Sequence, residues 1–144
     1  MTRIFSIVGT SKRGKTRLLK QLIVLLKKRG YTICVIKHSD HVLTYRDVDH
    51  EGKDTFTFSE AGADEVYLVS PQFTYHVKSE ETSLDEIIKT SKVDFILVEG
   101  FKQSKTKKIV IKTPQEKIAV KGEVIHTIEG EYDPEEIVSI LIHS

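Results

Sequence analysis

A short apolar run, a glycine-bounded loop and an amphipathic stretch follow one another at the start of the chain. Residues 3–8 are mostly β-branched or aromatic and stop at Gly9, which is typical of a buried strand. In residues 15–29, leucine and isoleucine recur at three- and four-residue steps, basic side chains occupy the last turn, and Gly30 follows as at a helix end. Residues 31–36 form a second strand-like run. The order strand, turn, helix, strand predicts the βαβ unit of a parallel sheet with a right-handed crossover.

The loop between the first strand and the helix has the sequence GTSKRGKT, which fits the pattern G-x-x-x-x-G-K-[ST]. In such a loop the backbone N–H groups turn around a phosphate, and the helix N-terminus adds partial positive charge. We expect Lys15 to reach the β and γ oxygens and Thr16 to offer its hydroxyl to Mg²⁺. Lys12 and Arg13 either reach an anion or point to solvent. The residues predicted to bind nucleotide phosphates are therefore Gly9, Thr10, Ser11, Lys12, Arg13, Gly14, Lys15 and Thr16.

A metal ion bound beside such a loop also needs an acidic ligand, which lies at the end of a neighbouring buried strand. Residues 95–98 are Phe-Ile-Leu-Val, an uninterrupted apolar run typical of a strand buried on both faces, and Glu99 follows at once. We therefore predict Glu99 and Thr16 as the metal ligands. Because the acid is a glutamate, it holds Mg²⁺ either directly or through a water molecule.

Residues 37–54 are polar, hold three histidines and five acidic residues, and show no periodicity, so they predict a long loop. Lys37 and His38 directly follow the second strand, at the carboxyl edge where ligands of open α/β folds bind. The same edge is expected to receive Asp49 and two residues near the end of the loop, Lys53 and Asp54. These side chains contact either nucleotide or substrate, or belong to a solvated loop. The histidine spacing matches no tight zinc pattern, and no N-K-x-D or T-K-x-D sequence is present to indicate which base is bound.

The remaining elements are assigned from periodicity and turn residues. We expect a short helix over residues 55–63, an antiparallel hairpin from 66–69 and 73–77, and a helix over 83–89 capped by its first serine. Strands are expected over 108–112 and 118–120, and a last helix runs to residue 142 after the cap Asp133. The predicted fold is α/β, a mostly parallel sheet flanked by helices with an antiparallel β-hairpin, in one domain over residues 1–144.

Composition excludes several classes of protein. The chain has 144 residues, 39% of them hydrophobic and 30% charged, with a net charge of +1, which is not typical of a disordered chain. We expect no membrane partner, because no apolar run approaches the roughly 18 residues that span a bilayer, and no nucleic acid. The expected location is cytoplasmic. The single cysteine, Cys34, is interpreted as a small buried hydrophobe. Ten basic residues and no acidic residue precede Asp40, so positive potential is concentrated in the N-terminal third.

Several ordered motifs together resemble the molybdopterin-guanine dinucleotide biosynthesis adapter protein (MobB) family. The resemblance covers residues 3 to about 112. It is carried by these segments: 9–16, Val35-Ile36-Lys37-His38, Asp49-x-x-Gly52-Lys53-Asp54-Thr55, Glu60-Ala61-Gly62-Ala63, Leu68-Val69-Ser70-Pro71 and Ile96-Leu97-Val98-Glu99-Gly100-Phe101-Lys102. Two departures from the family pattern are Lys12-Arg13, where small residues are more usual, and Ser39-Asp40, where a more histidine-rich run is typical.

The resemblance implies a P-loop NTPase-like fold that binds GTP with Mg²⁺, usually as a homodimer. It implies a partnership with the guanylyltransferase that attaches GMP to molybdopterin, and at most weak GTP hydrolysis; whether molybdopterin itself is bound stays open. Its implied site residues are Gly9, Gly14, Lys15 and Thr16 for phosphates and metal, Glu99 as the metal-side acid, and Lys37, His38, Asp49, Gly52, Lys53 and Asp54 at the edge of the site.

Two other functions remain open from the residues. One is an ATP-dependent small-molecule kinase in which the loop over residues 37–54 holds the acceptor and one of its carboxylates acts as base. The other is a non-enzymatic adapter in which nucleotide orders the fold and the hairpin over residues 66–77 pairs two chains edge to edge.

Overall fold

A computed structural model of the chain describes residues 1–10, 12–39, 41–49 and 53–144, with the backbone alone at Lys12 and Arg13. The described chain divides into two compact units. One contains residues 1–38 and 88–144, and the other contains residues 39–87. The expectation of a single domain stays a prediction.

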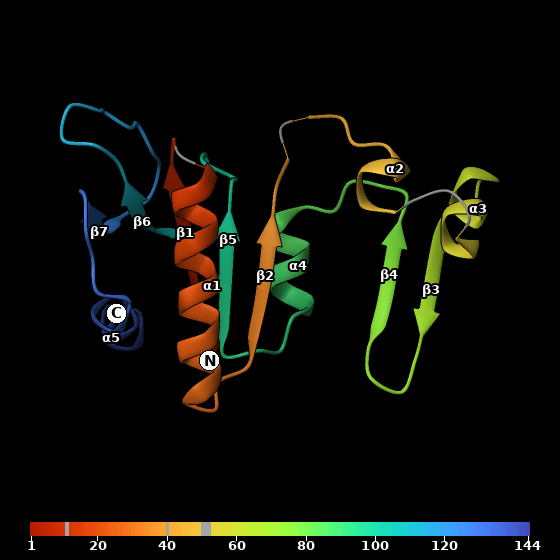
Figure 1. Cartoon of the computed structure of the whole chain (residues 1–144), viewed down its shortest axis with the longest axis horizontal. Coiled ribbons are helices and arrows are strands. Elements are labelled where there is room, and N and C mark those ends of the chain that lie inside the picture. Colours follow the sequence, from red (N-terminus) through yellow and green to blue (C-terminus); the bar gives the residue numbers. More distant parts are fainter. Residues whose placement is uncertain (11, 40, 50–52) are drawn as a thin grey trace. The chain divides into compact units, whose positions relative to one another are not determined.

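The first unit is built on a five-stranded sheet in the order β2-β5-β1-β6-β7. Every pair of neighbouring strands in it is parallel, so all five strands have their carboxyl ends at one edge (Figure 1). The strands are β1 (Arg3–Gly9), β2 (Ile33–Lys37), β5 (Phe95–Glu99), β6 (Lys107–Ile111) and β7 (Val124–Ile128). This edge is where the βαβ unit places the end of β1 and the start of the following helix.

Two helices pack their apolar stripes on one face of the sheet. Helix α1 (Lys12–Lys28) and helix α5 (Pro134–His143) share a core with alternate residues of the strands. The helices are also tied to each other by an ion pair of 2.7 Å between Arg29 and Glu135. The fully buried side chains of this core are Phe5, Ile7, Leu18, Leu22, Leu26, Phe95, Leu97, Ile109, Ile137, Val138 and Leu141. The sheet positions of the site are therefore held by a continuous apolar layer.

The second unit contains two short helices and a hairpin. These are α2 (Tyr45–Val48), α3 (Asp54–Glu60), β3 (Glu65–Val69) and β4 (Thr74–Lys78), and the two strands are antiparallel. Ser70 closes the hairpin turn, because its hydroxyl oxygen accepts from the Phe73 amide at 3.2 Å. Helix α4 (Leu84–Thr90) follows, and Ser83 caps it by accepting from the Glu86 amide at 3.2 Å.

The structure confirms the βαβ unit, the buried strand before Glu99, the hairpin, the Ser83 cap and the last helix. It also confirms the predicted fold class. Cys34, expected to be buried, is only half-buried on β2. Across the described part of the chain, no helix is both long and apolar enough to cross a membrane.

Three predictions of local structure are wrong. Helix α1 begins at Lys12 instead of Lys15, because the second half of the phosphate-loop motif is itself the first helical turn. The region 37–54 is not all loop: it contains α2, where the Asp47 carboxylate accepts from the Thr44 amide and hydroxyl at 2.6 and 3.0 Å.

No strand forms over residues 118–120. The strand beside β6 is β7, which the periodicity argument missed. Before it, Gly122 turns the chain with a φ of +83°, and a Cβ there would lie 2.5 Å from the Thr106 carbonyl oxygen. Four of the five residues of β7 pair with β6 from Lys108 to Ile111, with a register shift after Lys108, whereas a three-residue apolar stretch offers too few ladder bonds to compete.

Candidate nucleotide-binding site

The centre of the site is the end of β1, between β5 and β6 at the carboxyl edge of the sheet. Gly9 pairs with Ile111 there, and a Cβ at Gly9 would lie 2.6 Å from the Ile111 carbonyl oxygen. Only glycine therefore lets β6 approach this closely where the phosphate loop starts. The chain then passes through Thr10 into the first turn of α1.

The first turn of α1 contains the remaining described residues of the motif. Gly14 and Lys15 are half-buried and Thr16 is exposed. Ser11 and the side chains of Lys12 and Arg13 lie outside the described residues, so their predicted contacts stay predictions. A loop that enters a 17-residue helix presents the positive end of the helix dipole to an anion.

Lys15 and Glu99 face each other across the end of the sheet. The Lys15 Nζ lies 3.9 Å from the Glu99 Oε1, and only 13% and 11% of the two side chains are exposed. At this distance the two groups attract each other without a hydrogen bond, so the Lys15 donors and the Glu99 acceptors can still bind other groups. The arrangement brings a cation for phosphate and an anion for metal to one place, as the sequence predicts.

The donor set around Glu99 fits Mg²⁺ in particular. Magnesium keeps several waters and is held by one or two carboxylates together with substrate phosphates. Glu99 supplies one nearly buried carboxylate beside Lys15, and Thr16 is the residue after Lys15 on α1. Within the described residues there is no group of three or more His, Cys, Asp or Glu side chains that could hold a metal ion. These residues can therefore hold Mg²⁺ together with a nucleotide, with Glu99 as the protein's carboxylate.

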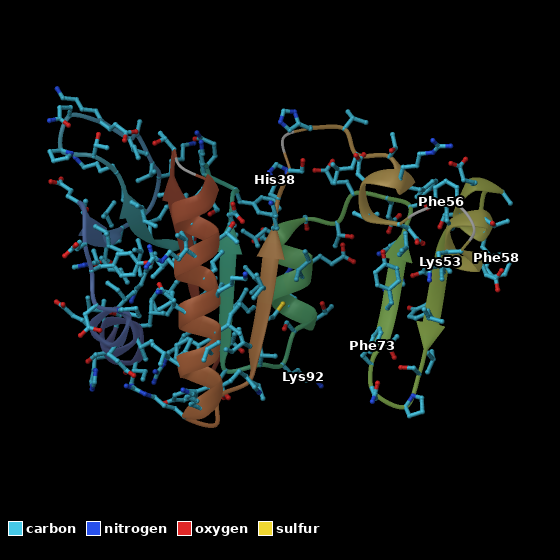
Figure 2. The ribbon with its side chains drawn as sticks, viewed as in Figure 1. His38, Lys53, Phe56, Phe58, Phe73 and Lys92 are labelled. Atoms are coloured by element: carbon cyan, nitrogen blue, oxygen red, sulfur yellow. The ribbon has the colours of Figure 1, made fainter. Side chains whose placement is uncertain are left out.

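Lys37 and His38 lie beside Glu99, as predicted. Lys37 is the register partner of Glu99 across β2 and β5, and the His38 amide donates to the Glu99 carbonyl oxygen at 2.9 Å. His38 lies just beyond the end of β2 (Figure 2), and its ring stacks on Phe101 with 4.3 Å between centroids. Gly100 and Phe101 both have positive φ, +95° and +49°, and a Cβ at Gly100 would be 3.0 Å from the His38 Cβ. The chain therefore turns sharply away directly after Glu99.

Asp49, Lys53 and Asp54 belong to the second unit. The Asp49 carboxylate accepts from the Thr55 hydroxyl at 2.6 Å, Lys53 is the residue before α3, and Asp54 is its first residue. The structure thus brings these residues together around the start of α3, where Figure 2 labels Lys53. Their predicted place beside Lys37 and His38 stays a prediction. Asp40, which departs from the histidine-rich run typical of the family, and Gly52, an implied site residue, lie outside the described residues.

The sequence argument missed a carboxylate that contacts the phosphate loop. The Thr10 hydroxyl donates to Glu116 Oε2 at 2.5 Å, and the Thr113 amide donates to Oε1 at 3.0 Å. These two donors hold the pKa of Glu116 below its ordinary value. Lys112 links the loop of Glu116 to the loop after β7. Its Nζ donates to the Glu116 carbonyl oxygen at 3.0 Å and lies 3.2 Å from Glu129 Oε1. Glu116 lies in an aperiodic loop, so no sequence signal pointed to it.

A fully buried lysine also escaped sequence reasoning. Lys108 is 0% exposed, and its Nζ donates to the carbonyl oxygens of Ser104 and Thr106 at 2.7 and 2.9 Å. Its other acceptors are the hydroxyls of the same two residues, and the Thr106 hydroxyl also bonds to Ser6 on β1. Burial lowers the pKa of the Lys108 ammonium. This cluster fixes the chain between Glu99 and β6, downstream of the site.

The family model described as "MobB: Molybdopterin guanine dinucleotide synthesis protein B" matches residues 4–128. The molybdopterin-guanine dinucleotide biosynthesis adapter protein of Escherichia coli (strain K12) is 39% identical over 118 residues, covering 77% of this chain and 66% of that protein. The Haemophilus influenzae protein of the same name is 38% identical over 114 residues, 75% of this chain and 62% of that protein. The matched region thus spans slightly less than two thirds of each relative.

Solved structures show the same fold. A crystal structure of molybdopterin-guanine biosynthesis protein B (MobB) has a TM-score of 0.74 and 22% identity, covering 97% of this chain and 98% of that chain. Bacillus subtilis MobB has a TM-score of 0.73 and 21% identity, covering 96% and 98%. With a family model that matches most of the sequence and a shared fold, the chain belongs to the molybdopterin guanine dinucleotide synthesis protein B (MobB) family.

Proposed function

We propose that this protein is a GTP-binding adapter in molybdopterin guanine dinucleotide biosynthesis, with weak Mg²⁺-dependent GTP hydrolysis at most. The observation that carries the nucleotide site is the pair Lys15 and Glu99, nearly buried and 3.9 Å apart where the phosphate loop enters α1. A phosphate held by the loop would lie between a cation that neutralises it and a carboxylate that reaches its metal ion.

The absence of a strong hydrolytic activity is part of the proposal. The family resemblance implies weak hydrolysis, and the pair Lys15 and Glu99 supplies charges suited to phosphate and metal instead of a base for water. Slow hydrolysis suits an adapter, because the bound nucleotide then stays intact while the partner protein binds.

The adapter role comes from the relatives, whose names describe molybdopterin-guanine dinucleotide biosynthesis adapter proteins. We propose that the partner is the guanylyltransferase that attaches GMP to molybdopterin. Copurification of that enzyme with the GTP-loaded protein, and its loss when GTP is omitted, would support a nucleotide-dependent partnership. Equal recovery with and without GTP would contradict it.

The nucleotide site is tested by replacing Lys15. The variant Lys15→Ala removes the ammonium that would contact the phosphates, so we expect its GTP affinity in Mg²⁺ to fall by about 100-fold or more, because charge-assisted bonds are the strong ones. Lys20→Ala is the matched control, since Lys20 is an exposed lysine on the same helix. Isothermal titration calorimetry measures both. Unchanged GTP affinity in Lys15→Ala would refute the site.

A further inference from the structure

The sequence lacks the motif that usually reads guanine, so another group must recognise the base if GTP is the ligand. The sheet order places β5, which ends at Glu99, on one side of β1, and β6 and β7 on the other. Figure 1 shows the loop between β6 and β7 extending beyond the same edge of the sheet at which β1 ends. This loop is therefore the neighbour of the phosphate loop on the side away from Glu99.

The position of Glu99 indicates which way a nucleotide would extend. If Glu99 were to hold the metal ion of a bound nucleotide, the terminal phosphates would lie on the Glu99 side of the loop and the nucleoside on the other side. With Glu99 on the β5 side, the nucleoside would extend over β6 and β7. Within the first unit, the described groups that meet the phosphate loop there are Ile111 beside Gly9 and Glu116 beside Thr10.

Glu116 is held ready to accept further hydrogen bonds. The Thr10 hydroxyl and the Thr113 amide each donate to a different carboxylate oxygen, and the Thr113 hydroxyl also helps to lower the pKa of this group, so its orientation is fixed. A carboxylate has about four acceptor positions, so Glu116 can still accept from further donors. The side chain is half-buried instead of covered. A fixed, ionised carboxylate is the partner that two adjacent N–H donors require.

We propose that the Glu116 carboxylate reads the base of a bound guanine nucleotide, accepting from its N1–H and 2-amino groups. Adenine has no such pair of adjacent donors, so the same carboxylate would discriminate against ATP. The inference rests on the proposed nucleotide site and names its specificity residue. Glu129, on the following loop, is already paired with Lys112 at 3.2 Å and serves as the control carboxylate.

The test compares four ligands in Mg²⁺ by calorimetry: GTP, ITP, ATP and inorganic tripolyphosphate. ITP lacks the 2-amino group, and tripolyphosphate lacks a nucleoside. The variant Glu116→Gln keeps an oxygen for the Thr10 hydroxyl but replaces one carboxylate oxygen with a donor. We expect GTP affinity to fall about 10- to 100-fold, as for loss of hydrogen bonds to a charged group. We expect ATP and tripolyphosphate to bind as before or slightly more tightly, because a negative charge near the phosphates is removed.

ITP gives an internal check. The wild-type protein should bind GTP more tightly than ITP, and Glu116→Gln should remove most of that difference, whereas Glu129→Gln should preserve it. Unchanged GTP affinity in Glu116→Gln would overturn the assignment. Equal losses for GTP and ATP would indicate a ribose contact, and an equal loss for tripolyphosphate would indicate that Glu116 only shapes the phosphate loop; either result overturns it too. A wild-type protein that binds none of the four ligands would refute the nucleotide site itself.

Discussion

At the scale of single residues, the fold brings together two opposite charges that lie far apart in the sequence. Lys15 and Glu99 are 84 positions apart in the sequence, yet β1 and β5 are neighbours and bring them within 3.9 Å. The sequence predicted both residues, because each follows directly from a buried strand: one through the glycine loop and the other at the strand's last position. Residue identity and element order together were enough for this pair.

Glu116 and Lys108 are the residues that sequence reasoning could not find. Glu116 reaches Thr10 across 106 positions from a loop without periodicity. Lys108 was predicted only as the first residue of a strand, but tertiary packing buries it completely and gives it four oxygen acceptors. Such contacts depend on how loops fold back on the sheet, which local patterns do not encode.

Lys108 has a consequence for the dependence of stability on pH. Its pKa is lowered in the folded state from 10.5 by burial, so the unfolded chain binds more protons between the folded-state pKa and 10.5. The contribution of Lys108 to the free energy of unfolding should therefore rise with pH through this alkaline window. We expect the stability of the wild-type protein relative to Lys108→Met to increase between pH 7 and pH 10, as measured by urea unfolding.

The control for this prediction is Lys107→Met, because Lys107 is the exposed neighbour on the same strand. The difference in free energy of unfolding between the wild-type protein and Lys107→Met should stay constant over the same pH range. A Lys108→Met difference that stays constant with pH, or shrinks, would contradict the assignment of a buried, destabilised ammonium.

At the scale of elements, hydrophobic periodicity identified what packs most tightly. The stripe of α1 and the apolar runs of β1 and β5 were predicted because each buries a regular set of side chains. Two short elements were not predicted. Helix α2 depends on one capping carboxylate, and β7 pairs only with β6 at the end of the sheet. In both cases a specific contact, not periodicity, decides the structure.

Helix α1 allows a direct test of this core. Leu22 is fully buried, so Leu22→Ala should lower the free energy of unfolding by about 2–5 kcal/mol through lost burial and a cavity. Val24 lies on the same helix with 52% of its surface exposed, and Val24→Ala should cost less than about 1 kcal/mol. Urea unfolding of both variants gives the comparison. Similar losses for the two would contradict the orientation of α1.

At the scale of the whole molecule, the second unit exposes apolar side chains on a two-stranded sheet. Tyr67, Leu68 and Val69 on β3 are 59%, 49% and 72% exposed, and Phe73 at the turn is 62% exposed. A two-stranded sheet is only marginally stable alone, and unpaired strand edges attract other strands. We propose that a second copy of the chain covers this hairpin in a homodimer.

The dimer is tested by light scattering at micromolar protein concentration. The wild-type protein should have the mass of two chains, and Val69→Lys should shift it towards one, because a charge would be buried in the interface. Val24→Lys places the same charge on α1, in the first unit, and should leave the mass unchanged. A wild-type monomer would contradict the hairpin dimer while leaving the nucleotide site untouched.

We propose that the pair Lys15 and Glu99 marks a site for GTP with Mg²⁺. Its most direct test is a calorimetric titration of the wild-type protein with GTP and with ATP, each in Mg²⁺ and each in excess EDTA. We predict clear binding of GTP, weaker binding of ATP, and a marked loss of GTP affinity in EDTA, since the metal ion links the phosphates to Glu99. Tighter binding of ATP than of GTP, or GTP binding unaffected by EDTA, would contradict the proposed site for GTP with Mg²⁺.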